Sequence, residues 1–266
     1  MAENKSEITW HTINWPPFMS IENGNTSGEY AKLLNFVESE LPQYTHKREV
    51  MTWSRIFKLI KAGKQSCTIF AFKNAEREKF TEFTIPFSIY ASNHVIMKES
   101  KAKSLGFDAT KPISLDELIQ NKSVKSILDK SRSYSSTLDD IIAEKASVSN
   151  FTKRAFTAKR LLQMLDANRI DYMLEYPSII KYLKKNINLK DKLIAIPIKE
   201  IAPFTWGYVA CPKTQWGKEL VDSLNIIISK NRPKKEYREM IEMMTTNEIE
   251  LKSMRKIYPN FIDSQK

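Results

Sequence analysis

The sequence predicts an α/β protein in two lobes, each with a mainly parallel sheet flanked by helices. Strand-like and helix-like segments alternate from residue 8 to residue 97, which is typical of strands joined by crossover helices. A second alternating series follows a polar stretch at residues 98–111. The segment from residue 204 to residue 262 holds a single strand, which cannot form a sheet alone. We therefore expect this strand to join the sheet of the first series.

This return of the chain predicts a discontinuous first lobe, residues 1–93 plus 202–266, with a second lobe, residues 94–201, inserted into it. The two crossings lie near residues 91–95 and 198–204. A length of 266 residues fits two domains at the usual size of roughly 150 residues each.

The first block opens with a strand at residues 8–13 that runs into Trp15-Pro16-Pro17-Phe18. Proline ends strand pairing, so we expect Trp15 and Phe18 to be exposed in a loop. Residues 30–37 form a helix with an apolar face.

The segment from Trp53 to Met97 is the most informative one. Trp53, Ile56, Phe57 and Ile60 have the i, i+3, i+4, i+7 spacing of a helix with one buried stripe, and a glycine at 63 suits its left-handed C-terminal cap. Residues 67–72 are an apolar run of strand composition. Arg77 follows in a polar turn at the carboxyl end of this strand, where open α/β sheets bind ligands. Arginine suits a carboxylate because its planar fork donates two parallel hydrogen bonds.

In the second block, Ser114 and Glu117 form a capping box for a short helix. Residues 130–136 are a hydroxyl-rich loop, and Ser136 with Asp139 opens the next helix. Such a loop at a helix N-terminus is either an anion site or a helix cap and nothing more. The remaining elements are strands at 124–128, 170–174 and 193–197 and helices at 157–168 and 177–185. The third block has a strand at 205–211 and helices at 215–229, 234–244 and 248–256.

Composition excludes several classes of function. The net charge of +11 comes from scattered lysines and arginines, which is typical of a solvated surface. Nucleic-acid binding is not expected, because no reading motif and no basic stripe with interleaved aromatics is present. We expect no metal or cofactor, since no Cys or His pair has ligand spacing and the 6 glycines form no phosphate-binding loop. Cys67 and Cys211 lie in predicted buried strands; their pairing is left open, and two free thiols are our expectation.

Several motifs together resemble family 3 of the extracellular solute-binding proteins, the amino-acid-type periplasmic binding proteins with the type II fold. The central one runs from Trp53 through Phe70-Ala71-Phe72-Lys73-Asn74-Ala75-Glu76-Arg77 to Phe83-Thr84-Ile85-Pro86-Phe87. The others, in the order of the family, are Trp15-Pro16-Pro17-Phe18, Gly28-Glu29-Tyr30, Leu161-Leu162, Asn168-Arg169-Ile170-Asp171-Tyr172 and Gly207-Tyr208-Val209-Ala210. The resemblance covers nearly the whole chain. It implies a ligand cleft between two lobes that close about a hinge.

The resemblance also implies a set of ligand contacts. Arg77 grips the ligand carboxylate in that family; the alternative is a surface arginine that pairs with Glu76 or Glu78. Arg132 and its loop are expected to converge on the same anionic group, with Trp15 and Phe18 as an apolar wall to which Trp10 or Tyr30 contribute. The expected ligand-binding residues are Arg77, Phe72, Ala71, Phe70, Trp15, Phe18, Arg132, Ser133, Tyr134, Ser135 and Glu175; no catalytic residue is expected.

Three departures from the family pattern bear on the ligand. Phe72 replaces a small hydroxyl residue, Ser131 replaces a glycine, and Glu175 is the nearest carboxylate to the usual aspartate, one position early. Asp171 is assigned to the preceding turn. A carboxylate-bearing ligand with an aromatic or apolar body therefore fits better than an ordinary α-amino acid.

We thus expect a monomeric, extracytoplasmic binding protein that captures a small carboxylate-bearing ligand by hinge closure, for uptake through the permease of an ABC transporter. The N-terminus has no apolar core of a signal peptide, which taken alone indicates the cytoplasm. The resemblance indicates export, so we expect a periplasmic protein whose signal peptide is absent from this chain. The alternatives are a ligand-sensing domain and an enzyme similar to cyclohexadienyl dehydratase. A lytic transglycosylase is disfavoured, because the chain ends soon after the third block.

Overall fold

The structure is a computed structural model that describes residues 6–22, 25–130, 132–245 and 248–265. The chain divides into two compact units. Unit 1 comprises Met1–Tyr90 and Trp206–Lys266, and unit 2 comprises Ala91–Thr205. The sequence placed these boundaries after residues 93 and 201, and the structure places them after Tyr90 and Thr205.

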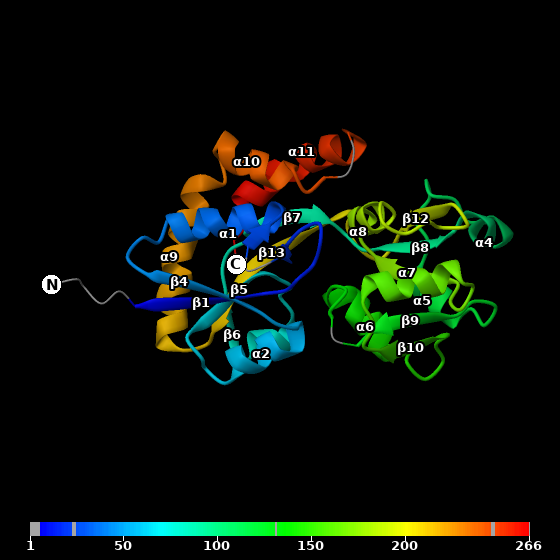
Figure 1. Cartoon of the computed structure of the whole chain (residues 1–266), viewed down its shortest axis with the longest axis horizontal. Coiled ribbons are helices and arrows are strands. Elements are labelled where there is room, and N and C mark those ends of the chain that lie inside the picture. The colour runs from blue at the N-terminus through cyan, green and yellow to red at the C-terminus, as the bar shows by residue number, and fades with distance from the viewer. Residues whose placement is uncertain (1–5, 23–24, 131, 246–247, 266) are drawn as a thin grey trace. The chain divides into compact units, whose positions relative to one another are not determined.

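Unit 1 contains a six-stranded sheet, a two-stranded hairpin and six helices among its described residues (Figure 1). The sheet strands are β1 (Glu7–Thr12), β4 (Thr45–Val50), β5 (Ser66–Ala71), β6 (Thr81–Phe83), β7 (Ser88–Ala91) and β13 (Phe204–Pro212). The hairpin is β2 (Ser20–Glu22) with β3 (Asn25–Ser27). The helices are α1 (Glu29–Ser39), α2 (Trp53–Lys61), α3 (Ala75–Glu78), α9 (Gln215–Asn231), α10 (Lys235–Glu242) and α11 (Glu248–Asp263).

The order of the unit 1 sheet is β4-β1-β5-β13-β6, with β7 paired to β13. Strands β4, β1 and β5 are parallel, whereas β13 runs antiparallel to β5 and to β6. The late strand therefore joins the first sheet, as the sequence predicted. The chain moves outward from β1 to β4 and back from β4 to β5, so right-handed crossovers place α1 and α2 on opposite faces (Figure 1).

Strand β5 is the buried centre of this sheet, and all six of its residues are buried. Its Cys67 forms a disulfide with Cys211 of β13, with the two Cα atoms 4.4 Å apart. Our expectation of two free thiols was wrong. The reason is topological, because β13 returns beside β5 in antiparallel orientation and places the two cysteines across from each other at the short spacing of a non-hydrogen-bonded pair.

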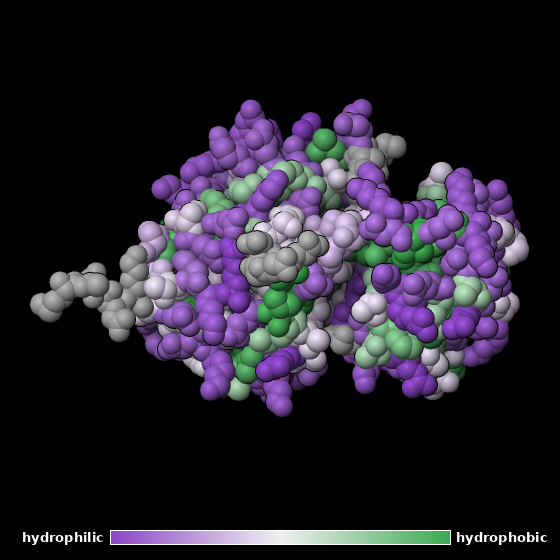
Figure 2. All heavy atoms as spheres, viewed as in Figure 1, coloured by the Kyte–Doolittle hydropathy of each residue, from purple (hydrophilic) through white to green (hydrophobic). Residues whose placement is uncertain are grey.

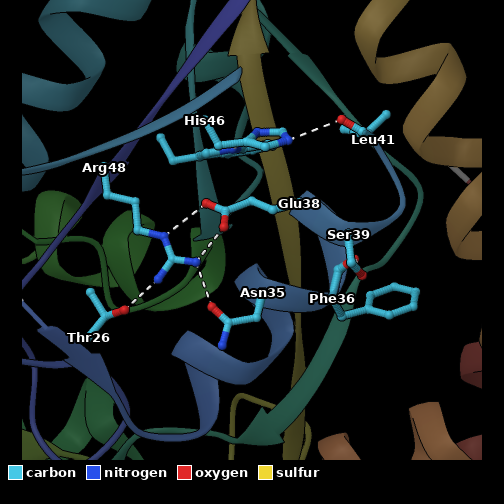
Figure 3. Close-up of polar contacts among 9 residues, drawn as sticks. Thr26, Asn35, Phe36, Glu38, Ser39, Leu41, His46 and Arg48 are labelled. Atoms are coloured by element: carbon cyan, nitrogen blue, oxygen red, sulfur yellow. Dashed lines mark hydrogen bonds and ion pairs between the residues drawn. The ribbon is translucent and has the colours of Figure 1, made fainter. Parts of the chain in front are cut away.

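The edge strand β4 is fastened to α1 by Arg48 (Figure 3). Its guanidinium donates Nε to Glu38 Oε1 at 2.8 Å and Nη2 to Glu38 Oε2 and to Asn35 Oδ1, both at 2.5 Å. Nη1 donates to Thr26 Oγ1 in β3. This bidentate arrangement joins the hairpin, the helix and the edge of the sheet through one side chain.

Unit 2 contains a five-stranded sheet with helices on both faces (Figure 1). The strands are β8 (His94–Lys98), β9 (Ser126–Asp129), β10 (Phe151–Arg154), β11 (Tyr172–Glu175) and β12 (Leu193–Pro197). The helices are α4 (Glu99–Ser104), α5 (Leu115–Gln120), α6 (Ser136–Glu144), α7 (Ala158–Asp166) and α8 (Pro177–Leu183). The sequence analysis missed α4 and β10, which are short and polar and therefore carry little hydrophobic pattern.

The order of the unit 2 sheet is β10-β9-β11-β8-β12. Strands β10, β9 and β11 are parallel, and β8 is antiparallel to both β11 and β12. Successive residues of β8 point to opposite faces: Val95 and Met97 pack with α5 and α6, and Ile96 packs with α7 and α8. Two apolar cores therefore lie on the two faces of one sheet.

A distant carboxylate completes the predicted cap of α5. Ser114 Oγ accepts from Glu117 N at 3.2 Å, as a capping box requires. Glu200 then accepts from Ser114 Oγ at 2.6 Å and from Leu115 N at 3.0 Å. Local sequence spacing cannot reveal this partner, because Glu200 lies 86 residues after Ser114.

The surface in Figure 2 is mostly hydrophilic on both units, with hydrophobic atoms in small patches. Within the described ranges, no helix combines the length and the apolar composition that crossing a membrane requires.

Candidate functional site

In unit 1, Arg77 lies on the short helix α3, directly after β5. The side chain of Asn74 caps this helix and accepts from Arg77 N at 2.9 Å. The guanidinium donates Nη1 to Phe72 O at 2.8 Å and lies 3.9 Å from the centroid of the Phe57 ring. The alternative that Arg77 pairs with Glu76 or Glu78 stays a prediction; Glu78 Oε1 lies 3.1 Å from Lys73 Nζ. A ring face and a carbonyl thus orient this half-buried cation at the carboxyl end of a buried strand.

Four aromatic side chains of unit 1 form a continuous stack. Tyr30 lies against Phe70 with ring centroids 3.3 Å apart and against Phe18 at 4.9 Å, and Trp15 meets Phe18 at 5.2 Å. The prediction of two exposed aromatics was wrong for Phe18, which is 3 % exposed. The hydrogen bonds between Trp15 and Met19 close the loop and turn Phe18 inward onto Tyr30.

Trp10 does not belong to this stack. It is fully buried, and its Nε1 donates to His46 Nδ1 at 3.1 Å. Its expected contribution to the apolar wall was therefore wrong, because the side chain is part of the core between β1 and β4.

Phe70 holds an unusual backbone conformation, with φ of 61°. Bulky residues avoid this left-handed region, and such strain costs roughly 1–3 kcal/mol. The neighbouring strand packs closely against Phe70 and has room there only for glycine. A Cβ on Gly207 would lie 3.4 Å from Phe70 Cα and 2.9 Å from Tyr90 Cε1. Strain of this kind is concentrated at functional sites.

The same strand ends border a small pocket of unit 1. Its cavity volume is about 10 Å³, roughly the space of one water molecule. Its lining comes from the ends of β1 and β5, the start of α2 and the aromatic stack, namely Thr12, Ile13, Met19, Tyr30, Trp53, Thr68, Ile69 and Phe70. Of the other predicted residues, Ala71 is fully buried in β5, and the half-buried Phe72 lies 5.8 Å from Tyr90 between ring centroids.

In unit 2, Arg132 and Glu175 form an ion pair. Arg132 Nη1 lies 2.8 Å from Glu175 Oε2, and the two side chains are 14 % and 1 % exposed. Arg132 Nη2 donates to Asn93 Oδ1 at 3.0 Å. The rings of Tyr134 and Tyr176 lie 4.8 and 5.4 Å from the guanidinium carbon. We call these five residues the unit 2 cluster.

The loop before α6 binds a carboxylate of its own chain. Asp139 accepts from Tyr134 N at 2.9 Å and from Ser133 Oγ. The N-cap of α6 is Ser135, which accepts from Leu138 N at 3.2 Å, and not the predicted Ser136. Ser131 lies outside the described residues. This arrangement agrees with the alternative that the loop is a helix cap.

Burial and charge set the protonation of the unit 2 cluster. Burial by itself opposes the charged guanidinium, but the carboxylate of Glu175 outweighs it and raises the pKa of Arg132. Burial raises the pKa of Tyr134 to about 12 and raises that of Tyr176 as well. Both tyrosines are therefore neutral at physiological pH, while Arg132 stays charged.

In unit 1 the structure places Trp15, Phe18 and Phe70 in one aromatic stack and Phe72 O against Arg77. In unit 2 it joins Arg132 to Glu175 and Tyr134, whereas Ser133 and Ser135 contact α6.

Sequence reasoning missed Phe57 as the support of Arg77, and Asn93, Asp139 and Tyr176 as partners in unit 2. The one local signal was the position of Tyr176 directly after Glu175. Asp171, assigned to a turn, lies before β11 and accepts from Lys125 N at 2.9 Å. Within the ranges that the structure describes, no group of three or more His, Cys, Asp or Glu is placed to hold a metal ion.

The family model of bacterial extracellular solute-binding proteins, family 3, matches residues 8–247. A search of curated proteins gives no match.

Solved structures share the fold at low sequence identity. A histidine kinase sensor domain similar to periplasmic binding proteins is 17 % identical, with a TM-score of 0.68 and coverage of 88 % of this chain and 93 % of that one. An amino acid ABC transporter substrate-binding protein from Streptococcus pneumoniae, bound to L-arginine, is 18 % identical, with a TM-score of 0.65 and coverage of 91 % and 97 %. An ancestral amino-acid-binding protein, a precursor of cyclohexadienyl dehydratase, is 17 % identical, with a TM-score of 0.67 and coverage of 91 % and 96 %.

The fold is therefore that of the type II periplasmic binding proteins. Because the family model spans most of the chain, this protein belongs to family 3 of the bacterial extracellular solute-binding proteins.

Proposed function

We propose that this protein captures a small carboxylate-bearing solute outside the cytoplasm and does not transform it. The observation that carries the proposal is the placement of Arg77. Its guanidinium stands at the carboxyl end of β5, fixed by the Phe57 ring at 3.9 Å and by Phe72 O at 2.8 Å. A guanidinium held in this way loses little conformational entropy when it binds a carboxylate through two hydrogen bonds.

The aromatic stack supports an apolar or aromatic body for the ligand. Trp15 and Phe72 are half-buried and Trp53 lines the pocket, so ring surface lies close to the end of the strand that carries Arg77. Apolar walls with a few polar anchors are the usual composition of small-molecule sites. We propose that Arg77 holds the carboxylate and that these rings hold the body of the ligand.

Membership of an extracellular family supports a location outside the cytoplasm. The buried disulfide between Cys67 and Cys211 supports the same compartment, because disulfides persist in oxidising environments. We propose that the protein is periplasmic and monomeric and delivers its ligand to the permease of an ABC transporter. Closure of the hinge on the ligand is part of this proposal, and a fall of the solution radius on ligand addition, measured by X-ray scattering, tests it.

Two other functions have specific support. The similarity to a histidine kinase sensor domain supports ligand sensing as the second candidate function. The similarity to the precursor of cyclohexadienyl dehydratase supports an enzyme as the third candidate, with Glu175 as its acid or base. Both oxygens of Glu175 are engaged, Oε2 by Arg132 and Oε1 by Tyr176 N at 2.9 Å, which argues against that role.

A thermal-shift screen against amino acids, short peptides and aliphatic and aromatic carboxylates tests the binding role. A ligand that binds the native state alone raises the melting temperature. We expect Arg77→Met to weaken each hit by about 10- to 100-fold, the effect of losing a charge-assisted hydrogen bond. The control is Arg55→Met, which removes an exposed arginine from α2 of the same unit.

Hits that survive in Arg77→Met at full affinity contradict the role of Arg77. Each hit is also incubated with the protein and analysed by NMR. Formation of a product contradicts a pure binding function and favours the dehydratase class.

A further inference from the structure

An open cavity of unit 1 lies between helix α9, the segment after β6 and the residue pair after α11. Its volume is about 800 Å³, which is a usual size for a small-molecule site. It is lined by Ile85, Asn225, Ile226, Ser229, Lys230 and Gln265. None of these residues lines the small pocket beside the aromatic stack, so the cavity is separate from the strand ends near Arg77.

Part of the cavity lining is apolar. Ile226 is 71 % exposed, and Ile85 is the second aliphatic residue of the lining. The backbone N–H of Ile85 donates to Asn225 Oδ1 at 2.8 Å, which fixes the segment after β6 to α9. An alkyl chain that lies on these two isoleucines would remove apolar surface from water, which stabilises its binding.

The polar part of the lining consists of donors and one cation. Lys230 follows Ile226 by four positions on α9, so the two side chains are neighbours on the same face of the helix. Asn225 uses its Oδ1 to accept from Ile85, which leaves its amide Nδ2 as a donor. Among the lining residues that the structure describes, none is Asp or Glu. The charge of this lining therefore suits an anion.

The chain segments that border the cavity also enclose a second cation, Arg232, which is 1 % exposed. Its Nη1 donates to Pro86 O at 3.3 Å, and its Nη2 donates to Ser264 O at 3.0 Å. Pro86 directly follows Ile85, and Ser264 directly precedes Gln265, so both acceptors are adjacent in the chain to residues of the cavity lining.

The positive charge of Arg232 is not paired with a carboxylate in the part of the chain that the structure describes. All of its hydrogen bonds go to carbonyl or hydroxyl oxygens, and its buried Nε has no acceptor among the described residues. Arg48 of the same unit shows the contrast, because its Nε and Nη2 both donate to Glu38. A buried cation without a counter-ion is costly, and an anion held nearby would offset that cost.

We propose that this cavity is a second binding site, which takes a small amphipathic anion. The alkyl chain of the ligand lies on Ile226 and Ile85, and its phosphate or carboxylate head binds Lys230. Arg232, the C-cap of the same helix, adds positive charge without contacting the ligand. This site does not depend on Arg77 and goes beyond the proposed function.

Calorimetry on the whole chain with octyl phosphate and octanoate, both below their micelle concentrations, tests the site. Octan-1-ol supplies only the chain, inorganic phosphate supplies only the head, and octyltrimethylammonium reverses the charge. We expect octyl phosphate to bind at least about 10-fold more tightly than each of these three, because only it engages both parts of the lining. Equal affinity for octyltrimethylammonium would show a non-specific apolar contact and overturn the proposal.

Two substitutions of exposed side chains test the two parts of the lining without placing folding at risk. Lys230→Met should weaken octyl phosphate about 10-fold and leave octan-1-ol unchanged, since it removes a charge-assisted hydrogen bond. Ile226→Asn should weaken octyl phosphate to a similar extent and leave inorganic phosphate unchanged. Lys218→Met, which removes another exposed lysine of α9, is the matched control and should change no affinity.

A different role for Lys230 gives a different result. If this lysine only offsets the negative end of the helix dipole of α9, Lys230→Met lowers the melting temperature and leaves the affinity for octyl phosphate unchanged. That outcome overturns the proposal. Flotation with phosphatidylglycerol vesicles separates a free anion from a lipid surface, and binding to vesicles without binding of octyl phosphate or octanoate also overturns it.

Arg77→Met separates the two sites, because octanoate also fits the class of ligand proposed for Arg77. Binding of octyl phosphate should persist in this variant at unchanged affinity. Its loss in Arg77→Met would assign the probe to the strand ends near Arg77 and overturn the second site alone. Absence of any Arg77-dependent ligand overturns the proposed function and leaves the second site standing.

Discussion

The disulfide between Cys67 and Cys211 allows a stability prediction whose size follows from the topology. The cysteines are 144 residues apart, and the loop between them contains all of unit 2. Removing the disulfide frees a loop of that length in the unfolded chain and so lowers the free energy of unfolding by about 5 kcal/mol. If unit 2 stays folded while unit 1 unfolds, only about 30 residues of the loop are flexible and the loss is about 3.6 kcal/mol.

The arrangement of the tryptophans provides the assay. All five tryptophans, Trp10, Trp15, Trp53, Trp206 and Trp216, belong to unit 1, so their fluorescence in a denaturant titration reports the unfolding of that unit alone. Circular dichroism at 222 nm reports the helices of both units. The double variant Cys67→Ala/Cys211→Ala should lower the fluorescence midpoint strongly. The helical signal of unit 2 should shift less if the units unfold separately.

A control separates the cross-link from the packing of the sulfur atoms. Both cysteines are fully buried, so wild-type protein refolded in a reductant has the same side chains without the bond. Reduced wild type and the double variant should agree to within about 1 kcal/mol, the size of a small cavity term. A loss below about 2 kcal/mol in the reduced protein would refute the loop-entropy argument and indicate residual structure in its unfolded state.

Two further predictions concern unit 1. Gly207→Ala should lower the free energy of unfolding by about 1–3 kcal/mol through overpacking, because the new Cβ would clash with Ser88 Oγ and lie 2.9 Å from Tyr90 Cε1, and denaturation of the variant measures the loss; a loss under 0.5 kcal/mol would show that both side chains can move aside. Burial lowers the pKa of His11 in the folded state, so below a pH of about 6.5 the unfolded chain takes up the proton more readily and stability falls with acidification. The melting temperature of His11→Gln should therefore fall less than that of the wild type between pH 7.5 and pH 5.5. An equal fall would show that another group causes the acid sensitivity.

Strongly patterned elements were predictable from the sequence. The stripe of Ile56, Phe57 and Ile60 gives helix α2, and Gly63 ends it with φ of 72°. The single late strand had to join another sheet, and β13 does so beside β5. Short polar elements such as α4 and β10 were not predictable, because tertiary contacts rather than periodicity define them.

The candidate site was predictable as a set of positions but not as a set of contacts. The spacing placed Arg77 after β5, yet the Phe57 ring that orients it comes from a different helix. Arg132 was expected to bind an anionic ligand, and Glu175 was considered separately as a ligand contact. Their ion pair joins residues 43 positions apart, on β11 and on the loop before α6, and no local pattern encodes that distance.

The cross-link and the proposed ligand anchor act on the same strand. Cys67 fixes β5 to β13, and five positions later Phe72 O receives Arg77 Nη1 at the end of that strand. Gly207 and Tyr208 of β13 lie beside Phe70 and Ala71, so the strained backbone of Phe70 within β5 depends on how closely these two strands approach. Because the disulfide fixes the spacing of the two strands, it also limits the movement of the Arg77 guanidinium. Less conformational entropy is then lost when this group binds a ligand. Reduction should therefore weaken any Arg77-dependent ligand even under conditions where unit 1 remains folded, and unchanged affinity in the reduced folded protein would show that hydrogen bonding between the strands is sufficient.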